Sequence, residues 1–407
     1  MAIIERLTDD DLYKFTMQQV VLHKFPSAIV EYKFQDRGNV GLGFLAGRVR
    51  EEINALANIQ ATPEELTYLR SLKFLKRDYV DFLRIFRFFP QEHISVSSLD
   101  DRLEIRIRGP WLHTILYEVK VLAIVNQCYY EHLIESKGLS IDSLEDEGER
   151  RLREKIKLIK EQPSFNDFVS PFLFSNFGTR RRFSRDWAYQ VDAILAHEFR
   201  NWNNNPAVGF TGTSNVYNAM VQGIKPIGTM AHEYLQAMQA MTRIVTSQQL
   251  ALQSWAEEYR GDLGIALTDC LGLEIFLKDF DLYFAKLFDG VRHDSGDPDW
   301  WTEKIINHYK TLGIDPRTKT AVFSDGLNVP LAIELWKTWG NQIKTAFGIG
   351  TNLTNDLGLD ALKIVLKMVV CNNQPVAKIS DSDGKGMCED SGYIEYLKNR
   401  IQMRISE

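Results

Sequence analysis

The chain has 407 residues, of which 44% are hydrophobic and 25% charged, enough for roughly two or three domains with a substantial core. Its 48 lysines and arginines against 54 aspartates and glutamates give a formal charge of -6, which argues against a nucleic-acid-binding protein with a broad basic face. No uncharged apolar run is long enough to span a membrane, and the acidic start lacks a signal-like segment, which favours a cytoplasmic protein. The four cysteines are far apart and include no C-x-x-C pair, so we expect neither a disulfide framework nor a zinc ribbon.

The first 140 residues mix helix and strand patterns without regular alternation, which is typical of an α+β domain. Residues 8–11 predict a capping box that opens a helix to about residue 23, and Thr62-Pro63-Glu64-Glu65 repeats that signal with proline at the first helical position. Apolar and polar residues alternate over 30–35 and 102–108, the period of half-buried strands. We therefore expect a small antiparallel sheet here.

Two longer helices are expected next. Residues 112–136 predict a mostly buried helix, and the charged stretch 143–162 predicts a solvated helix that connects two domains.

From residue 171 the pattern changes to short apolar runs, each followed by a helical pattern. The runs are 171–174, 208–210, 264–267, 287–291, 320–323, 344–347 and 364–370. Strand-then-helix repetition predicts a parallel sheet with helical crossovers, and about seven units without an obvious reversal favour a barrel over an open sheet.

Polar clusters follow the first six of these runs, at the strand ends where the chemistry of such a barrel belongs. In chain order they are FGTRRR, TGTSN, TDC, RHDSGDP, SDG and GIGTN. A single polar cluster would mean little because loops are polar, but six in register indicate a common site.

The last cluster contains Gly348, Gly350 and Thr351. Its backbone N–H groups could close around a phosphate while the threonine adds a hydroxyl donor. The alternative is a strand-to-helix turn that needs glycine dihedrals. The late position in the barrel favours phosphate.

The first cluster places Phe177 and Gly178 beside three arginines. Guanidinium groups suit carboxylates and phosphates, and a ring can stack on a flat heteroaromatic substrate. The alternative is a solvated charge run, which we expect to hold for at least one of the three. Arg180, nearest the strand end, is the arginine that we place inside the site.

Asp269, Asp294 and Asp325 offer carboxylates at three successive strand ends. Such groups hold magnesium-bound polyphosphates or ribose hydroxyls, although each alone is more typical of a helix N-cap, and the two roles need not exclude each other. His232 lies near the start of a helix, next to Glu233; a lone histidine is usually structural, so the pattern does not settle its role.

The ordered strings LTDDDLYKF, FGTRRR, GTSNVYNA, GTMAHE, VRHDSGDP, FSDGL and FGIGTNLTND, spanning residues 7 to about 381, closely resemble the nicotinate phosphoribosyltransferase family. The resemblance implies an α/β fold of the type II phosphoribosyltransferase kind: an irregular α/β barrel with an N-terminal α+β domain, assembled as a homodimer. The expected limits are 1–140 for that domain, 141–170 for a helical connection, 171–380 for the barrel, and 381–407 for a segment packing back on the N-terminal domain.

The resemblance implies that nicotinate is joined to 5-phosphoribosyl 1-diphosphate, giving nicotinate mononucleotide and diphosphate, in the first step of NAD synthesis from nicotinate. It also implies Mg²⁺ and coupling to ATP hydrolysis through a phosphorylated histidine, which GTMAHE places at His232.

Roles for further residues come from the same resemblance. Phe177 and Tyr13 would sandwich the pyridine ring, with Tyr13 arriving from the other subunit. The remaining expectations are Arg180 and Arg292 at the nicotinate carboxylate or the phosphates, Asp294 and Asp325 at the ribose hydroxyls or magnesium, Asp269 and Asp294 as metal ligands, and Gly348, Gly350 and Thr351 at the 5-phosphate.

One position bears on the choice of substrate. In the related nicotinamide-using enzymes an aspartate follows the Gly-Thr pair, whereas Gly212-Thr213 is followed here by Ser214. An aspartate would repel a carboxylate and a serine can donate to it, so Thr213 and Ser214 are expected at a nicotinate site.

Three alternatives stay open on the residues alone. A nicotinamide phosphoribosyltransferase is disfavoured by Ser214. A phosphosugar aldolase or isomerase barrel would need a Schiff-base lysine or a catalytic glutamate at a strand end, and neither Lys225 nor Lys278 is well placed for this. A non-catalytic nucleotide-binding or sensor protein predicts loss of His232 or of the DSGDP carboxylates, and both are present.

Overall fold

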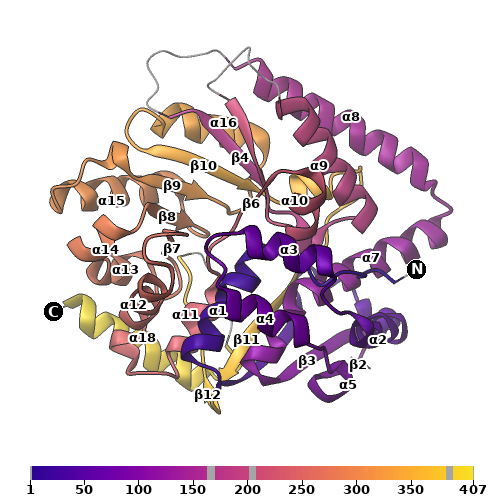
Figure 1. Ribbon diagram of the computed structural model, residues 1–407, viewed down its shortest axis with the longest axis horizontal. Helices are drawn as coiled ribbons and strands as arrows, with labels where there is room; N and C mark the ends of the chain where they lie inside the picture. Colours follow the sequence, from indigo (N-terminus) through magenta and orange to yellow (C-terminus); the bar gives the residue numbers. More distant parts are fainter. Residues whose placement is uncertain (1, 163–169, 201–207, 382–387, 407) are drawn as a thin grey trace.

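The computed structural model describes residues 2–162, 170–200, 208–381 and 388–406. They form an antiparallel sheet with its helices and a curled parallel sheet surrounded by a second set of helices (Figure 1). The expected combination of an N-terminal α+β domain and an irregular α/β barrel is confirmed.

The antiparallel sheet has five strands in the order β12-β11-β1-β3-β2. Their bounds are β1 (Ile29–Asp36), β2 (Ile94–Leu99), β3 (Arg102–Pro110), β11 (Ile364–Cys371) and β12 (Gln374–Pro375). Tyr32 and Phe34 of β1 and Ile105 and Ile107 of β3 are all buried. The alternation in the sequence therefore predicted both strands and their inward faces correctly.

One predicted strand belongs to a different sheet. The run 364–370 was expected in the barrel, but it forms β11, which pairs antiparallel with β1 and sets Leu366 opposite Phe34. That expectation was wrong because a short apolar run indicates burial, and burial alone does not identify the partner strand or its direction.

The two predicted helix starts differ in outcome. Thr62 and Glu65 form the expected capping box at α3. The box expected at residues 8–11 does not form, because the hydroxyl of Thr8 donates to Glu65 at 2.5 Å instead. Helix α1 begins at Leu12 after Asp11, whose side chain makes no capping bond.

The N-terminal helices surround the antiparallel sheet and lead into the barrel. They are α1 (Leu12–Lys24), α2 (Ala46–Ala55), α3 (Pro63–Ser71), α4 (Arg77–Ile85), α5 (Pro90–His93), α6 (Trp111–Thr114), α7 (Tyr117–Lys137) and α8 (Ile141–Lys160). The long buried helix expected over 112–136 is thus divided into α6 and α7, and the charged helix expected over 143–162 is α8.

The parallel sheet has seven strands in the order β6-β5-β4-β10-β9-β8-β7. Their bounds are β4 (Phe172–Asn176), β5 (Val208–Thr213), β6 (Lys225–Pro226), β7 (Ile265–Leu267), β8 (Gly290–His293), β9 (Thr320–Phe323) and β10 (Lys344–Ile349). Strand β10 pairs with β4 in the middle of the sheet, while β6 and β7 are the edge strands. Among the described residues the barrel is therefore open between β6 and β7.

Helices follow the barrel strands as the crossover pattern predicted. They are α9 (Arg185–Arg200), α10 (Val216–Gln222), α11 (His232–Met238), α12 (Ser247–Tyr259), α13 (Leu273–Asp279), α14 (Leu282–Leu287), α15 (Pro298–Thr311), α16 (Val329–Trp339), α17 (Thr351–Thr354) and the C-terminal α18 (Ser391–Ser406).

The C-terminal segment contacts both parts of the molecule. Leu397 of α18 packs in a small cluster with Leu271 and Ile275 on the barrel side. Glu389, just before α18, pairs with Lys33 and Arg106 of the antiparallel sheet.

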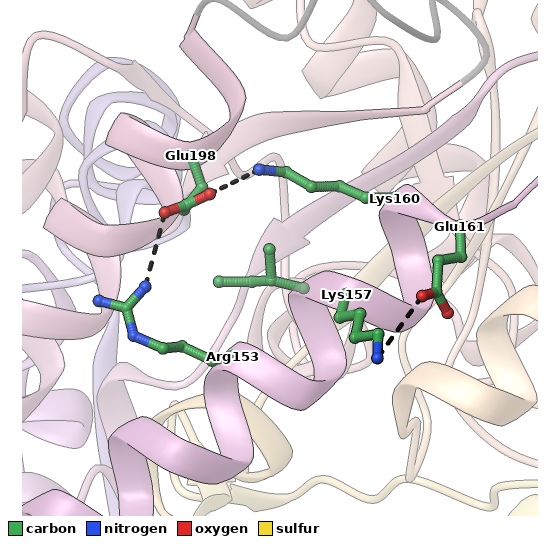
Figure 2. A pocket seen from close by; sticks show the side chains of 6 residues that line it. Arg153, Lys157, Lys160, Glu161 and Glu198 are labelled. Carbon is green, nitrogen blue, oxygen red and sulfur yellow. Dashed lines mark hydrogen bonds and ion pairs between the residues drawn. The ribbon is translucent and has the colours of Figure 1, made fainter.

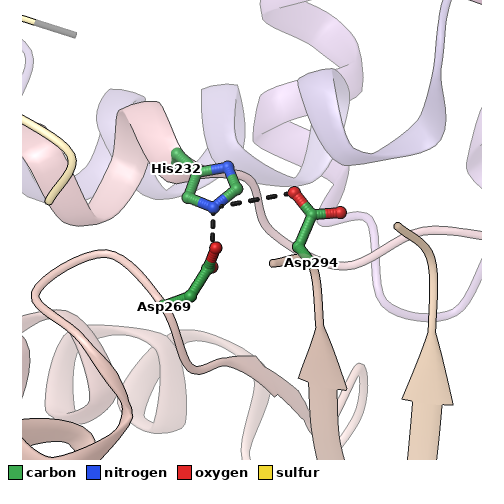
Figure 3. Close-up of side chains that lie close together, drawn as sticks. All are labelled: His232, Asp269 and Asp294. Carbon is green, nitrogen blue, oxygen red and sulfur yellow. Dashed lines mark hydrogen bonds and ion pairs between the residues drawn. The ribbon is translucent and has the colours of Figure 1, made fainter. Parts of the chain in front are cut away.

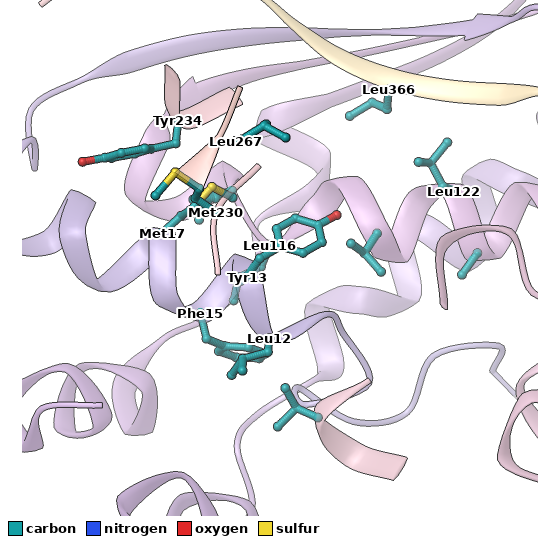
Figure 4. Packing of buried hydrophobic residues seen from close by; sticks show 14 of the residues in the cluster. Leu12, Tyr13, Phe15, Met17, Leu116, Leu122, Met230, Tyr234, Leu267 and Leu366 are labelled. Carbon is teal, nitrogen blue, oxygen red and sulfur yellow. The ribbon is translucent and has the colours of Figure 1, made fainter. Parts of the chain in front are cut away.

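Helix α1 joins the two parts beside the open edge of the barrel. Its Leu12, Phe15 and Met17 pack among buried side chains that include Met230 (Figure 4). The Thr16 hydroxyl donates to the carbonyl of Thr229 at 2.6 Å, just before α11. This contact holds α1 against the segment that leads from β6 to α11.

Inside the barrel, aromatic side chains stack from strand to strand. The rings of Phe172 and Phe347 lie 5.1 Å apart, and those of Phe347 and Phe323 lie 5.5 Å apart. Such packing makes the interior a solid core, so the free space lies at the strand ends. Within the described part of the chain, every helix is too short or too polar to cross a membrane.

Candidate active site

A cavity of about 810 Å³ opens at the carboxyl ends of the barrel strands, a size typical of small-molecule sites. Its lining includes Tyr13, Phe177, Arg180, Ser214, His232, Arg292, Asp294, Asp325, Gly348, Gly350 and Thr351. The structure thus brings together nearly all the residues singled out from the sequence. Thr213 and Asp269 are buried behind this lining.

The turn after β4 supplies one wall of the cavity. Phe177 and Arg180 line it, and Arg181 does so as well. Burial, helped by the neighbouring Arg180 charge, lowers the pKa of Arg181 to about 10. Arg182 turns away into the protein, where its guanidinium donates to both carboxylate oxygens of Asp9 at 2.6 and 2.8 Å. Arg182 is 1% exposed, so it is not the solvated arginine expected among the three.

Tyr13 of the same chain lies at this wall. The guanidinium carbon of Arg180 is 6.0 Å from the centre of its ring, within the range of a cation–π contact. Arg180 Nη1 is also 3.5 Å from Glu118 Oε1. The cavity therefore contains a tyrosine without any contribution from a second subunit, although the resemblance implied that Tyr13 would arrive from one.

Ser214 follows β5, and an N-terminal loop fixes its position. The N–H of Leu12 donates to the carbonyl of Ser214 at 2.8 Å, and the N–H of Val216 donates to the carbonyl of Asp10 at 2.9 Å. The same loop brings Asp11 to the cavity beside Ser214. Burial raises the pKa of the Asp11 carboxyl, although the Arg180 charge and the hydroxyls of Ser214 and Thr179 act against it.

Thr213 lies buried behind this wall and does not line the cavity. Its side chain is 1% exposed, and its hydroxyl contacts the buried carboxylate of Asp192. Ser214 is thus the member of the Thr213–Ser214 pair that faces the cavity.

His232, the first residue of α11, is held by a buried carboxylate (Figure 3). Its Nε2 lies 2.8 Å from Asp269 Oδ1 and 3.7 Å from Asp294 Oδ2. The other oxygen of Asp269 lies 2.6 Å from Lys378 Nζ and accepts a hydrogen bond from Ser295. Both oxygens of Asp269 are therefore engaged.

Burial is the main reason that the His232 ring stays neutral. Burial, together with the Lys378 charge, lowers the pKa of His232 to about 4 even though Asp269 acts in the opposite direction. Burial alone would raise the pKa of Asp269, but His232 and Lys378 outweigh it and hold that pKa well below its usual value. A neutral imidazole whose Nε2 donates to Asp269 has its lone pair on Nδ1.

Asp294 and Asp325 line the cavity at the ends of the adjacent strands β8 and β9. Asp294 Oδ1 accepts from the Ser324 hydroxyl at 2.8 Å. Burial would raise the pKa of Asp294, but the neighbouring charges of Arg292 and Lys378 lower it below its usual value. An ionised carboxylate is a hard oxygen donor suited to Mg²⁺ or to sugar hydroxyls.

Ligand atoms of His232, Asp269 and Asp294 lie close enough together to hold a metal ion. However, the Lys378 ammonium already supplies the positive charge at Asp269. Asp294 and Asp325 line the cavity, whereas Asp269 lies behind it. A metal ion in the cavity would therefore meet Asp294 and Asp325 rather than Asp269.

The glycine-rich turn after β10 lies directly against Phe177. A Cβ atom on Gly348 would come within 2.3 Å of the Phe177 ring, so glycine is required there by close contact. Gly350 precedes the short helix α17, which begins at Thr351. Gly348, Gly350 and Thr351 all line the cavity, and a glycine-rich turn that leads into a helix is typical of an anion site.

Several cavity residues carry no recognisable motif and were missed in the sequence. Arg37, Glu118, Lys363, Lys367 and Lys378 all line it. Burial lowers the pKa of Lys367 to about 8. Burial would raise the pKa of Glu118, but the charges of Lys14, Arg180 and Lys367 lower it to about 2. Most of these residues lie on the N-terminal domain or in its sheet, so only the tertiary fold brings them to the barrel.

A second hollow lies on the outer surface at α8 and α9 (Figure 2). Its charged residues pair with one another: Lys160 lies 2.5 Å and Arg153 3.6 Å from Glu198, and Lys157 lies 3.7 Å from Glu161. It is remote from the strand ends, and we assign it no chemistry.

Comparison with known proteins gives consistent matches over the chain. The model of the nicotinate phosphoribosyltransferase (NAPRTase) family matches residues 172–404, and that of the NAPRTase N-terminal domain matches residues 8–126. The nicotinate phosphoribosyltransferase of Acidovorax sp. (strain JS42) is 51% identical over 98% of this chain and 99% of its own length. That of Burkholderia mallei (strain ATCC 23344) is 50% identical over 97% and 96%.

Solved structures agree with these sequences. The crystal structure of nicotinate phosphoribosyltransferase from Vibrio cholerae superposes with a TM-score of 0.90 at 38% identity, covering 98% of this chain and 94% of that chain. The one from Porphyromonas gingivalis gives 0.88 at 35% identity, with coverage of 98% and 100%.

Proposed function

This chain belongs to the nicotinate phosphoribosyltransferase family, and from that membership we propose that it joins nicotinate to 5-phosphoribosyl 1-diphosphate, giving nicotinate mononucleotide and diphosphate. One observation supports this most strongly. A single cavity holds an aromatic and arginine wall suited to a pyridine carboxylate, and also a glycine-rich turn suited to a phosphate.

Nicotinate would bind at the wall formed by the turn after β4. Phe177 and Tyr13 offer flat faces to the pyridine ring, and Arg180 offers a fork of donors to its carboxylate. Ser214 adds a hydroxyl at the same end. Because Asp11 lies beside Ser214, the Arg180 charge is also needed to offset its repulsion of a substrate carboxylate.

The sugar phosphate would extend from this wall across the strand ends. Gly348, Gly350 and Thr351 would hold the 5-phosphate, and Asp294 and Asp325 would accept from the ribose hydroxyls. Arg292 suits the diphosphate, because its buried Nε has no hydrogen-bond partner among the described residues.

The reaction replaces a C–O bond by a C–N bond at the anomeric carbon. The pyridine nitrogen supplies the electron pair and diphosphate leaves with the pair of the broken bond. Positive charge develops at the sugar and negative charge on the leaving group, so positioning and charge stabilisation carry the catalysis. No protein nucleophile is required for this step.

Mg²⁺ fits the carboxylates at the ends of β8 and β9. We assign it to Asp294 with Asp325, because both oxygens of Asp269 are engaged. When bound, the ion would neutralise charge on the diphosphate. Arg292 and Lys378 supply positive charge from the chain itself at the same place.

We also propose that ATP hydrolysis is coupled to this reaction through phosphorylation of His232. The neutral ring would attack the γ-phosphorus of ATP through Nδ1, forming an N–P bond as the P–O bond to ADP breaks. Asp269 would hold the Nε2 proton and stabilise the positive charge that develops on the ring. Water would later cleave the N–P bond and release phosphate.

The assembly and cellular role are further parts of the proposal. A homodimer with shared active sites would add groups to a cavity that already contains its own Tyr13. The product would be the precursor of NAD made from nicotinate, in the cytoplasm. Sedimentation of the purified chain with and without substrates would test the dimer.

The test of the reaction uses purified protein with 5-phosphoribosyl 1-diphosphate and Mg²⁺, offered either nicotinate or nicotinamide. Chromatography should show nicotinate mononucleotide from nicotinate and at most a trace of product from nicotinamide. Preferred use of nicotinamide would support the rival nicotinamide phosphoribosyltransferase. No product from either base would contradict the proposal.

A further inference from the structure

Asp192 of α9 is fully buried behind the base end of the cavity and lies outside its lining. Its Oδ1 accepts a hydrogen bond from Asn176 Nδ2 at 2.8 Å, and its Oδ2 accepts one from Asn218 Nδ2 at 2.8 Å. The Thr213 hydroxyl contacts the same carboxylate. One side chain thus joins strand β4, strand β5 and helix α10.

Asn176 connects Asp192 to the turn that carries Phe177. It is the last residue of β4, and its Oδ1 accepts from the N–H of Gly178 at 2.9 Å. The intervening residue is Phe177. The carbonyl of Asn176 also accepts from the N–H of Ser214 at 2.8 Å, so its position sets both sides of the base end.

Asn218 ties the same carboxylate to the turn after β5. Its own N–H donates to the side chain of Asn215, the N-cap of α10, at 2.9 Å. Ser214 lies between that cap and Thr213. The turn carrying Ser214 is therefore held on both sides by residues that contact Asp192.

We propose that Asp192 is a positioning residue for the base subsite, holding Phe177 and Ser214 in the arrangement that receives nicotinate. This inference rests on the proposed function and adds to it a residue that does not touch substrate.

The chemistry of the partners explains why a carboxylate is needed. Both asparagines present NH₂ donors, and only a side chain with an acceptor on each branch satisfies both. The partners of Asp192 from β4, β5 and α10 are all neutral. Burial, despite these hydrogen bonds, raises the pKa of Asp192 to about 6. A carboxyl group that is buried without a cationic partner lowers the stability of the protein. A role of Asp192 in positioning the base subsite would account for this cost.

The first variant is Asp192→Asn, which keeps the shape but turns an NH₂ group toward a partner NH₂ group. We expect the KM for nicotinate to rise about tenfold, with kcat and the KM for 5-phosphoribosyl 1-diphosphate changed by less than about twofold. The KM of the parent for nicotinate should also rise as the pH falls through about 6, and Asp192→Asn should lose this dependence.

The second variant restores the lost hydrogen bond by exchanging the partners. In the double variant Asn176→Asp with Asp192→Asn, residue 176 accepts both from Gly178 and from the new amide, while the new amide oxygen accepts from Asn218. We expect the KM for nicotinate to return to within about threefold of the parent. A merely structural role would not produce this recovery at constant kcat.

A matched control is Asp279→Asn, which alters another buried carboxylate, paired with Arg404 and Gln248. We expect it to leave the KM for nicotinate unchanged, and thermal unfolding shows whether each variant is folded. If Asp192→Asn does not fold, the double variant alone decides: recovery of folding and of the parent KM supports positioning.

The outcomes separate this inference from the proposed function. An inactive parent with nicotinate would contradict the proposed function. An active parent whose KM for nicotinate is unchanged by Asp192→Asn, or whose double variant is no better than the single one, would overturn the inference alone.

Discussion

At the scale of single residues, the proposed coupling to ATP hydrolysis depends on His232. His232→Ala should abolish stimulation by ATP while leaving slow ATP-independent turnover, because the cavity keeps its substrate-binding wall and its phosphate turn. Initial rates with and without ATP measure the stimulation. Mass spectrometry of ATP-treated protein detects the phosphorylated residue. A phosphorylated His232 should be found only in the parent.

The control for this variant is His308→Ala, which removes a histidine bonded to the Phe280 carbonyl and remote from the cavity. It should retain ATP stimulation. An equal ATP response in His232→Ala and the parent would contradict the assignment.

Ser214 provides a test of substrate choice. Ser214→Asp adds a second carboxylate beside Asp11 at the base end, so it should repel nicotinate and accept from the amide of nicotinamide. We expect the ratio of kcat/KM for nicotinate to that for nicotinamide to fall at least about tenfold. An unchanged ratio would show that Ser214 does not contact the substituent of the base.

Nearly all the residues singled out from the sequence line the cavity, but the sequence did not identify the groups that tune their charge. Lys378 follows no motif, yet its ammonium pairs with Asp269 and thereby acts on His232. A lone lysine far along the chain gives no local signal of this contact. Arg181 and Arg182 show the same limit, because three consecutive arginines do not reveal which of them points inward.

At the scale of elements, the contact between the turn after β10 and the aromatic wall is tight. Gly348→Ala would place a Cβ atom within 2.3 Å of the Phe177 ring, and the ring or the turn must shift. Because both belong to the proposed substrate site, we expect kcat/KM for nicotinate to fall at least about tenfold. Steady-state kinetics measure this fall.

Gly47→Ala is the matched control, since nothing lies within 4 Å of its added methyl group in α2. It should leave the kinetics unchanged and slightly raise stability, because alanine favours a helix. Unchanged kinetics in Gly348→Ala would show that the turn tolerates displacement of Phe177.

Most strands could be predicted, two from alternation and the others from short apolar runs, and the failures have physical causes. Strand β6 has only Lys225 and Pro226, too short to show any period. Strand β11 was predicted as a strand but placed in the wrong sheet, since pairing with β1 depends on a partner more than three hundred residues away. The start of α1 was misplaced because Glu65, distant in sequence, binds Thr8.

At the scale of the whole molecule, the two parts are joined by a buried ion pair. Asp9 of the N-terminal loop accepts from Arg182 and from Asn215 of the barrel. Removing one member leaves an unpaired buried charge, so Asp9→Ala should lower the free energy of unfolding by about 3 kcal/mol. Asp81→Ala, which breaks an exposed pair with Arg70, should cost at most about 1 kcal/mol.

The difference in the free energy of unfolding between the parent and Asp9→Ala should become smaller at low pH. Burial would raise the pKa of Asp9, but Arg182 and Asn215 hold it below the usual 3.8. Its contribution is therefore complete above about pH 4 and is lost as the pH falls through the lower folded pKa. The gap between parent and Asp9→Ala should shrink in acid; a constant gap would contradict the ionic assignment.

The repeating strand-then-helix pattern predicted a barrel. It did not predict the opening between β6 and β7 that the described residues show. The return of β11 to the N-terminal sheet also brings Lys367 to the cavity. Such long-range arrangement depends on packing between distant segments, which no local pattern describes.

The most direct test of the account is the amount of ATP hydrolysed per nucleotide formed when purified protein, 5-phosphoribosyl 1-diphosphate and Mg²⁺ are given each base. We predict that nicotinate yields nicotinate mononucleotide with ADP and phosphate released in step, and that His232→Ala uncouples the two. Product formed from nicotinamide in preference to nicotinate, or no product from either base, would contradict it.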